Sequence, residues 1–366
     1  MQVQGKPHRS LWLAANGRDV ECIDQRCLPH TFMVATVSSV DEAVEAIRDM
    51  WVRGAPLIGA MAAYGVCLGL HEACTEEHLL QVGRQLISSR PTAVNLRWAV
   101  ERMHKVVLSR DPAQWVEAAY EEAACICDED VATNASLGEH GVKLIQDIWE
   151  KKGRSGPVRI LTHCNAGWLA TVDWGTALAP VYRAQQDGIP VHVWVDETRP
   201  RNQGAHLTAW ELCMAGIDHH LIVDNAGGHL MQHGMVDICI VGTDRTAANG
   251  DVCNKIGTYL KALAAWDNGV PFYVALPGST IDWQTEEGFA IPIEERDQEE
   301  VLFVQGQSST GRVDMLGIAP VETPAANYAF DVTPARLITG LITERGICSA
   351  SRKGLRQLYP EKNCRP

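Results

Sequence analysis

RILTHCNAG, residues 159–167, begins as an apolar strand and ends in a turn. Four later runs share this character, being nearly uncharged and followed by turns or helical patterns: residues 191–196, 220–224, 236–242 and 271–276. Near-continuously apolar strands that alternate with helices are typical of a parallel sheet covered on both faces. The middle of the chain is therefore predicted to be an α/β domain built on a parallel sheet.

The region before this sheet has a different pattern. Residues 10–37 have the composition of short strands and turns, and helical patterns then cover residues 41–50, 56–71, 76–88, 92–109 and 113–131. Ser39 is placed to cap the first of these helices. A length of 366 residues favours about two domains. We expect a small sheet with a helical body over residues 1–132 and the parallel-sheet domain over residues 133–366.

The composition excludes several classes of protein. Hydrophobic residues make up 46% of the chain and charged residues 21%, so the chain can bury a core and is not a disordered one. The formal net charge of −13 argues against nucleic-acid binding and against an anionic membrane surface, because both require a basic face. An anionic substrate would therefore need a locally positive site.

Cysteine usage and hydropathy indicate the compartment. The twelve cysteines are irregularly spaced and form no C-x-x-C motif, so we expect free thiols in a reducing cytosol. Residues 1–16 lack the apolar run of a signal peptide. The uncharged stretch 54–70 is slightly short of the ~20 residues that span a membrane, so a buried helix of a cytoplasmic protein is predicted there.

Ligands of open parallel sheets bind beyond the carboxyl ends of the strands, where this chain places several polar residues. Cys164 is followed by a predicted helix whose positive end would lower the pKa of the thiol; the alternative is a small buried residue without function. Asp244 follows six uncharged residues, so it would be partly desolvated and suited to act as an acid; a turn or N-cap aspartate is the alternative. For Asp196 and Asp224 the turn role is favoured.

Basic residues also occur where helices are predicted to begin. Arg53, Arg90 and the pair Asn254-Lys255 each lie at such a position. Free N–H groups at a helix N-terminus attract anions, so the three cations could together hold a phosphate. For any one of them, a surface charge beside an ordinary cap is the alternative.

Cofactor and metal motifs are weak. No G-x-G-x-x-G follows the first strand of the predicted sheet, so a dinucleotide cofactor is not supported. His229 and His233 are four residues apart and could share a helix face, but no third ligand lies at metal-ligand spacing. We therefore expect no metal and no cofactor.

With these residues in view, the chain resembles the methylthioribose-1-phosphate isomerase family of methionine salvage, within the superfamily of initiation-factor-2B-like regulatory subunits. The motifs are VRGAP (52–56), SRPTAVNL (89–96), THCNAG (162–167), DETRP and NQG (196–200 and 202–204), Asp224-Asn225 and GTDRTAANGDVCNKIGTY (242–259). They occur in the family's order over nearly the whole chain.

This resemblance implies roles for individual positions. The family's catalytic cysteine and aspartate fall on Cys164 and Asp244. Its substrate-contacting positions fall on Arg53, Gly54, Ala55, Arg90, Gln203, Asn254 and Lys255. The resemblance also implies a homodimer without metal or cofactor, in which a small N-terminal domain precedes a Rossmann-like catalytic domain, acting on a small phosphorylated sugar.

The chain departs from the family's commoner pattern at Trp168, Thr243, Thr246 and Cys253, which leaves the 5-substituent of the sugar open. The candidate substrates are 5-methylthioribose 1-phosphate, 5-deoxyribose 1-phosphate and ribose 1,5-bisphosphate. A non-catalytic regulatory subunit of the translation-initiation nucleotide-exchange factor is the alternative from another class, since a fold does not fix a function.

The expected reaction is an aldose–ketose isomerisation. An aldose 1-phosphate cannot open to a free aldehyde, because its C1 oxygen is esterified. We expect Asp244 to protonate the ring oxygen and Cys164 to act on the C2 proton or its hydroxyl. Proton transfer through an enolate and a 1,2-hydride shift both remain open.

Overall fold

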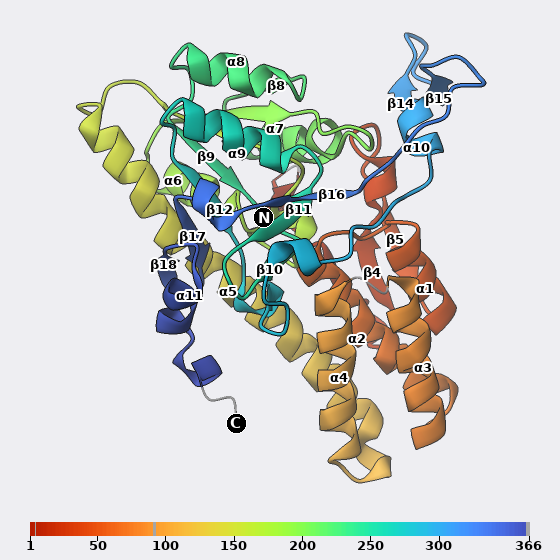
Figure 1. Ribbon diagram of the computed structural model, residues 1–366. Helices are drawn as coiled ribbons and strands as arrows, with labels where there is room; N and C mark the ends of the chain where they lie inside the picture. Colours follow the sequence, from red (N-terminus) through yellow and green to blue (C-terminus); the bar gives the residue numbers. More distant parts are fainter. Residues whose placement is uncertain (4, 91–92, 364–366) are drawn as a thin grey trace.

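A seven-stranded sheet lies at the centre of the computed structural model, which describes residues 1–3, 5–90 and 93–363 (Figure 1). In the order in which they pair, its strands are β18 (Gly346–Cys348), β17 (Gly340–Thr343), β12 (Phe272–Ala275), β9 (Ile238–Val241), β6 (Val158–Thr162), β7 (Val191–Asp196) and β8 (His219–Ile222). All pairs are parallel except β17 with β18 at the edge. Counted along the chain, the parallel strands are arranged 3-2-1-4-5-6, which is the Rossmann order. The predicted Rossmann-like α/β fold is confirmed.

The strands are apolar along their length because both faces of the sheet are covered. In β6, Ile160 packs in one core and the next residue, Leu161, packs in the core on the opposite face. The covering helices are α5 (Trp115–Lys151), α6 (Ala179–Gln186) and α7 (Ala209–Ala215) on the first face, and α8 (Ala226–Gln232) and α9 (Thr258–Asp267) on the second. Because the helices cover the two faces of the sheet, the carboxyl ends of the strands are free to form a site.

The N-terminal part combines a small sheet with a helical body, as predicted. Its elements are β3 (Leu11–Leu13), β4 (Val20–Ile23), β5 (Val34–Val37), α1 (Val40–Arg48), α2 (Ala55–Glu72), α3 (Glu76–Ser89) and α4 (Val94–Leu108). Ser39 caps α1 by accepting a hydrogen bond from the N–H of Glu42. Every residue of α2 from Leu57 to Leu70 is buried, which confirms the predicted buried helix. None of the described helices is long and apolar enough to cross a membrane.

Helix α5 connects the two parts of the molecule. It runs for 37 residues without a break, packing on α2 and α4 along one stretch and on α6 along another. The predicted division at residue 132 falls inside this helix, so α5 contributes to both cores. The cysteines within the described residues are all free thiols.

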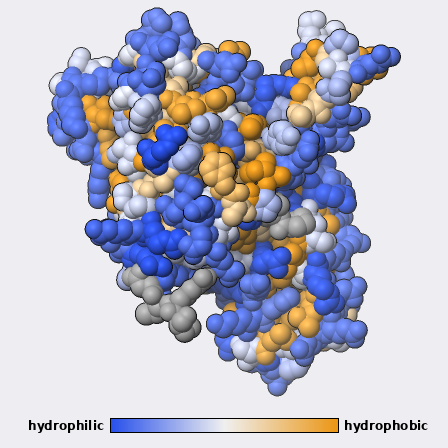
Figure 2. All heavy atoms as spheres, in the orientation of Figure 1, coloured by the Kyte–Doolittle hydropathy of each residue, from blue (hydrophilic) through white to orange (hydrophobic). Residues whose placement is uncertain are grey.

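The last third is more regular than its sequence indicates. It supplies β17 and β18 to the main sheet, and α11 (Arg352–Leu358) follows them. A second sheet orders β13 (Ile281–Asp282), β10 (Arg245–Ala247), β11 (Val252–Lys255) and β16 (Phe330–Thr333). The hairpin β14 (Phe303–Gln307) and β15 (Val313–Gly317) follows α10 (Glu299–Leu302) and projects from the body (Figure 1). Figure 2 shows apolar side chains on the surface of this projection.

The contact between α5 and α6 provides a test of this packing. Gly141 lies where a Cβ atom would approach Pro180 Cγ to 2.3 Å. Gly141→Ala should therefore lower the free energy of unfolding by about 1–3 kcal/mol, even though alanine favours a helix by ~1 kcal/mol. Gly228→Ala in α8 is the control, because its Cβ would meet only Ala264 Cβ at 3.7 Å. Urea denaturation measures both variants, and equal stability of the two would contradict the packing.

Candidate active site

A pocket lies at the carboxyl ends of β6 and β9, where the strand order reverses. The residues implied as a site by the sequence all line this one pocket: Arg53, Gly54, Ala55, Arg90, Cys164, Gln203, Asp244, Asn254 and Lys255. They come from the start of α2, the end of α3, the loops after β6, β7 and β9, and strand β11. Tertiary structure thus brings together residues as far apart in the chain as Arg53 and Lys255.

Cys164 is held in an unusual backbone conformation. Its φ is +64°, which is rare for a residue other than glycine. The Thr198 hydroxyl accepts a hydrogen bond from the Cys164 N–H at 2.8 Å, and the Thr208 hydroxyl donates to the Cys164 carbonyl at 2.8 Å. The thiol itself is 3.1 Å from Gln203 Oε1. Two hydroxyls therefore fix the strained residue and aim its sulfur into the pocket.

The predicted helix after Cys164 is absent. The segment continues as a loop with one short turn at Trp168–Ala170, and α6 begins only at Ala179. Among the described residues no helix begins directly after Cys164, so the predicted cause of a lowered thiol pKa is absent and that prediction is wrong. Burial instead raises the pKa of Cys164, against the opposing effects of Arg53 and Lys255. This environment therefore favours the neutral thiol over the thiolate.

Asp244 lies between β9 and β10, and its N–H donates to the carbonyl of Cys253 at 3.0 Å. This bond joins the end of the main sheet to the hairpin β10–β11, which carries Lys255. The Asp244 carboxyl is half-buried and close enough to raise the pKa of both Cys164 and Lys255. A thiol, a carboxyl and an ammonium group therefore face one another across a small space.

Three cations surround this space, as an anionic substrate would require. Burial lowers the pKa of Lys255 and of Arg90, while the Asp244 carboxylate opposes both shifts. The Lys255 ammonium also lies 4.7 Å from the centre of the Phe330 ring. Such partly desolvated cations bind a phosphoryl group more strongly than solvated ones.

A helix start is predicted beside each of the three cations, and the structure confirms only the one beside Arg53. Arg53 does precede a helix: Gly54 is the N-cap of α2, and no side chain caps the first turn, which leaves N–H groups free for an anion. Lys255 does not, because it ends strand β11 and α9 begins at Thr258. Arg90 follows the end of α3, and the Pro91-Thr92 expected to open the next helix lies outside the described residues.

Gly54 is required by both conformation and space. Its φ is +89°, and a Cβ atom would lie 2.3 Å from the carbonyl oxygen of Ala170. The backbone of the two parts of the molecule is therefore in direct contact at the edge of the pocket. This contact sets the position of the neighbouring Arg53.

A chain of hydrogen bonds orients Arg53. Its guanidinium donates to Asn165 Oδ1 at 2.5 Å and to the Asn165 carbonyl at 2.8 Å. The Asn165 amide in turn donates to Glu211 Oε1 at 2.8 Å. Glu211 is fully buried and also accepts from the N–H groups of Trp168 and Leu169 and from the Tyr182 hydroxyl. Burial raises the pKa of Glu211, and these donors oppose that shift.

A second buried network lies beneath Cys164. The ring of His163 is 2.9 Å from Asp196 Oδ2 and 2.8 Å from the carbonyl of Ile256, and Lys261 Nζ is 3.1 Å from the same Asp196 oxygen. Asp196 is thus a buried ion-pair partner, and its predicted turn role is wrong. Asp224 lies in the turn between β8 and α8, but its carboxylate accepts from the N–H groups of Thr198 and Arg199 after β7, so it makes a tertiary contact and not the predicted local turn contact.

This second network could also be considered as a metal site, since ligand atoms of His163, Asp196 and Asp224 lie within 4.8 Å of one another. The Lys261 ammonium, however, bonds both Asp196 Oδ2 and the Asp224 carbonyl. A bound cation would have to displace this positive charge. The arrangement is better suited to an internal ion pair.

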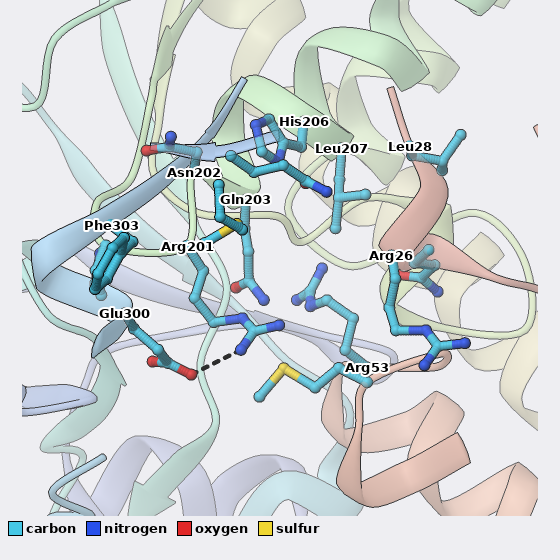
Figure 3. A pocket seen from close by; sticks show the side chains of 15 residues that line it. Arg26, Leu28, Arg53, Arg201, Asn202, Gln203, His206, Leu207, Glu300 and Phe303 are labelled. Atoms are coloured by element: carbon cyan, nitrogen blue, oxygen red, sulfur yellow. Dashed lines mark hydrogen bonds and ion pairs between the residues drawn. The ribbon is translucent and has the colours of Figure 1, made fainter. Parts of the chain in front are cut away.

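A larger pocket adjoins the first and shares Met50, Arg53 and Gln203 with it (Figure 3). Its walls come from the N-terminal part, from the segment after β7 and from the hairpin β14–β15. Arg201 Nη1 is 2.7 Å from Glu300 Oε1, and this pair ties the base of the hairpin to the segment after β7 (Figure 3). The apolar lining residues are Leu28, Met50, Pro200, Leu207, Phe303 and Met315.

Comparison with known proteins identifies the family. Residues 51–350 match the initiation factor 2 subunit family. The chain belongs to this family. Among curated proteins, it is 60% identical to the methylthioribose-1-phosphate isomerase of Rhodospirillum rubrum over 99% of this chain and 94% of the relative, and 59% identical to that of Sinorhizobium medicae over 99% and 100%.

Solved structures of family members agree with the fold. The crystal structure of 5-methylthioribose 1-phosphate isomerase from Pyrococcus horikoshii has a TM-score of 0.83 at 42% identity and covers 97% of both chains. That of translation initiation factor eIF-2B, subunit delta, from A. fulgidus has a TM-score of 0.81 at 38% identity and covers 97% of this chain and 100% of that one. The resemblance drawn from the sequence motifs is confirmed.

Two supporting residues escaped the sequence analysis. Glu211 is the only acidic residue between Gly204 and Ala215, and an isolated acid in an apolar helix is a signal of buried pairing. His163 lies in an uncharged stretch next to Cys164 but has no spacing motif with its partner Asp196. Neither residue could be connected to the site without the tertiary contacts.

Replacing Glu211 tests the chain of bonds that orients Arg53. Glu211→Gln places an amide NH₂ among four hydrogen-bond donors, so the free energy of unfolding should fall by about 2–3 kcal/mol and inorganic phosphate should bind more weakly. Tyr182→Phe is the matched control, because it removes one donor and leaves the carboxylate, for an expected loss of ~1 kcal/mol. Urea denaturation and calorimetry measure both effects. A Glu211→Gln variant as stable as Tyr182→Phe would contradict the role.

Proposed function

We propose that the protein converts 5-methylthioribose 1-phosphate to 5-methylthioribulose 1-phosphate. The observation that carries the proposal is the pocket in which Cys164 and Asp244 lie among Arg53, Arg90 and Lys255. A sugar phosphate needs this combination, because the cations hold the phosphoryl group while the thiol and the carboxyl are free to move protons. Relatives at about 60% identity bear the name of this isomerase.

The first step opens the ring with the phosphate in place. Asp244, in its protonated form, donates a proton to the ring oxygen as the bond from that oxygen to C1 breaks, which leaves positive charge at C1 and a carboxylate on Asp244. The cations that hold the phosphoryl group fix C1 beside the two reacting residues. Burial of the pocket keeps water away from the reactive carbon.

The second step moves the C2 hydrogen to C1 and leaves a carbonyl at C2. In the enolate route Cys164 carries this hydrogen as a proton. In the hydride route the hydrogen migrates directly with its electron pair, and the C2 hydroxyl then loses its proton. In both routes the proton lost from substrate restores the Asp244 carboxyl. The enolate route needs Cys164 as a thiolate, so its proton first passes to the Asp244 carboxylate, which becomes the acid of the first step. The neighbouring Arg53 and Lys255 favour the thiolate.

We place the 5-substituent of the sugar in the adjoining pocket of Figure 3. This pocket meets the first at Arg53 and Gln203, and Phe303 lies across it from Arg53 (Figure 3). Met315 also lines the pocket. A methylthio group is apolar and polarizable, and methionine and aromatic side chains contact sulfur favourably. The Arg201–Glu300 pair neutralises a cation that a 5-phosphate would need, which favours the methylthio sugar over ribose 1,5-bisphosphate.

We further propose a homodimer that works in the cytoplasm. The free thiols of the described residues fit a reducing compartment. Leu221 and Val223 near the edge strand β8, and Leu260 and Trp266 on α9, are each more than half exposed, as expected of a surface covered by a second chain. A solution mass of a single chain by light scattering would contradict the dimer.

The catalytic assignment is tested with purified protein and 5-methylthioribose 1-phosphate. Cys164→Ala and Asp244→Asn should each lower kcat by about 10²–10⁴-fold, because each removes a proton-transfer group. Cys213→Ala, which removes an exposed thiol, should leave kcat unchanged. Normal turnover by the double variant would overturn the assignment. A wild-type protein inactive on the methylthio, deoxy and phospho sugars alike would favour the regulatory-subunit alternative.

The placement of the 5-substituent predicts a change in specificity. Met315→Ala should lower the ratio of kcat/KM for 5-methylthioribose 1-phosphate over 5-deoxyribose 1-phosphate by about 10-fold, because a lost apolar contact costs about 1–3 kcal/mol. Leu316→Ala is the matched control, since Leu316 is also exposed on β15 but does not line the pocket. An equal effect of both variants on the ratio would contradict the placement.

A further inference from the structure

A cluster of three metal-ligating side chains lies at the edge of the main sheet, apart from the pocket. His192 belongs to β7, His220 belongs to the edge strand β8, and Asp218 lies just before β8. Nδ1 or Nε2 of each histidine and a carboxylate oxygen of Asp218 all lie within 4.8 Å of one another. His192 Nε2 and His220 Nδ1 are 2.7 Å apart. At this distance the two nitrogens share a hydrogen bond, and two nitrogens bound to one ion would lie somewhat farther apart.

The cluster rests on rigid backbone. Strands β7 and β8 are paired in parallel, and the N–H of Val193 donates to the carbonyl of Asp218 at 2.9 Å. The Trp194 ring packs against both histidines, at 4.5 Å from the ring centre of His192 and 5.4 Å from that of His220. The Trp194 indole N–H is itself fixed by the carbonyl of Met235 at 2.9 Å. The ligands are therefore pre-positioned by sheet pairing and packing.

The hydrogen bonding of the cluster is incomplete within the described residues. His192 is 7% exposed, yet its Nδ1 has no hydrogen-bond partner there. Within the described residues, the one hydrogen-bond partner of the His192 ring is the His220 ring. The two imidazoles therefore share one proton between Nε2 of His192 and Nδ1 of His220. An ion bound at His192 Nε2 would replace this shared proton as the link between the two rings.

We propose that His192, Asp218 and His220 bind a divalent transition-metal ion of the zinc class. Two imidazole nitrogens and one carboxylate oxygen form a donor set typical of such ions. Asp218 and His220 are exposed, so the remaining coordination positions open to water. The bound ion would link the edge strand β8 to β7 and stabilise that edge of the sheet.

This proposal is independent of the proposed enzymatic function. His192 lies in the first half of β7, whereas Asp196 ends the strand on the side of the pocket. None of the three ligands lines either pocket described above. The ion would therefore alter stability and leave the isomerase reaction unchanged.

Cobalt(II) titration of the full chain tests the site, because bound cobalt absorbs visible light. We expect one equivalent to bind and zinc to displace it. His220→Ala and Asp218→Asn should each weaken binding at least 10-fold. The double variant His229→Ala, His233→Ala is the matched control: it removes another close histidine pair, at the C-terminal end of α8 with ring centres 4.1 Å apart, and should bind cobalt normally.

Thermal unfolding gives a second readout. Zinc should raise the Tm of the wild-type chain and of the His229/His233 control, but not that of His220→Ala. Because His220 and Asp218 are exposed, their variants should fold normally without metal. Failure of the wild-type chain to bind cobalt, or loss of binding only in the His229/His233 variant, would overturn the proposal.

Discussion

A single buried carboxylate, Glu211, holds the site in place. It accepts hydrogen bonds from Trp168 and Leu169 on the loop after β6, from Tyr182 on α6, and from Asn165. Asn165 in turn accepts a hydrogen bond from Arg53, which belongs to the N-terminal part of the chain, so the position of Arg53 also depends on Glu211. One charge in the core therefore fixes both the loop that carries Cys164 and the cation that faces it. Glycine is required at position 167 for the same reason, because a Cβ there would overlap Glu211.

The second constraint is electrostatic. The chain carries a net charge of −13, yet its pocket is lined by Arg53, Arg90 and Lys255 with Asp244 as their nearby counter-charge. Burial lowers the pKa of Lys255 and raises that of Cys164, so the environment opposes charge on both residues. An anionic ligand that enters would neutralise the cations, which gives the site a preference for a phosphoryl group over a neutral sugar.

The base of the hairpin β14–β15 is attached to the segment after β7 by a hydrogen bond and by an ion pair. Arg199 donates to the carbonyl of Val301 at 2.7 Å, and Glu300 binds both Arg201 and Arg296. Although burial acts in the opposite direction, these two arginines lower the pKa of Glu300 to about 2, so the ion pairs persist throughout the physiological pH range. The base of the hairpin is thus anchored, while its apolar side chains form one wall of the adjoining pocket.

The sequence by itself determined the parallel sheet, the helical N-terminal part and the strand ends at which Cys164 and Asp244 lie, because apolar periodicity and strand-end polarity are local properties. It also carried the family motifs that select the pair. Only the tertiary structure decided the rest. The late strands β17 and β18 have no distinctive local pattern. Their place in the sheet depends on the pairing of β17 with β12, in which Tyr273 lies opposite Gly340, and β18 joins the sheet only through β17. The direction of the Cys164 pKa shift is set by burial against two cations, Arg53 and Lys255, from separate segments, and the partners of Glu211 and His163 are tertiary contacts. Such effects cannot be predicted from local sequence, since they depend on contacts between residues that are far apart in the chain.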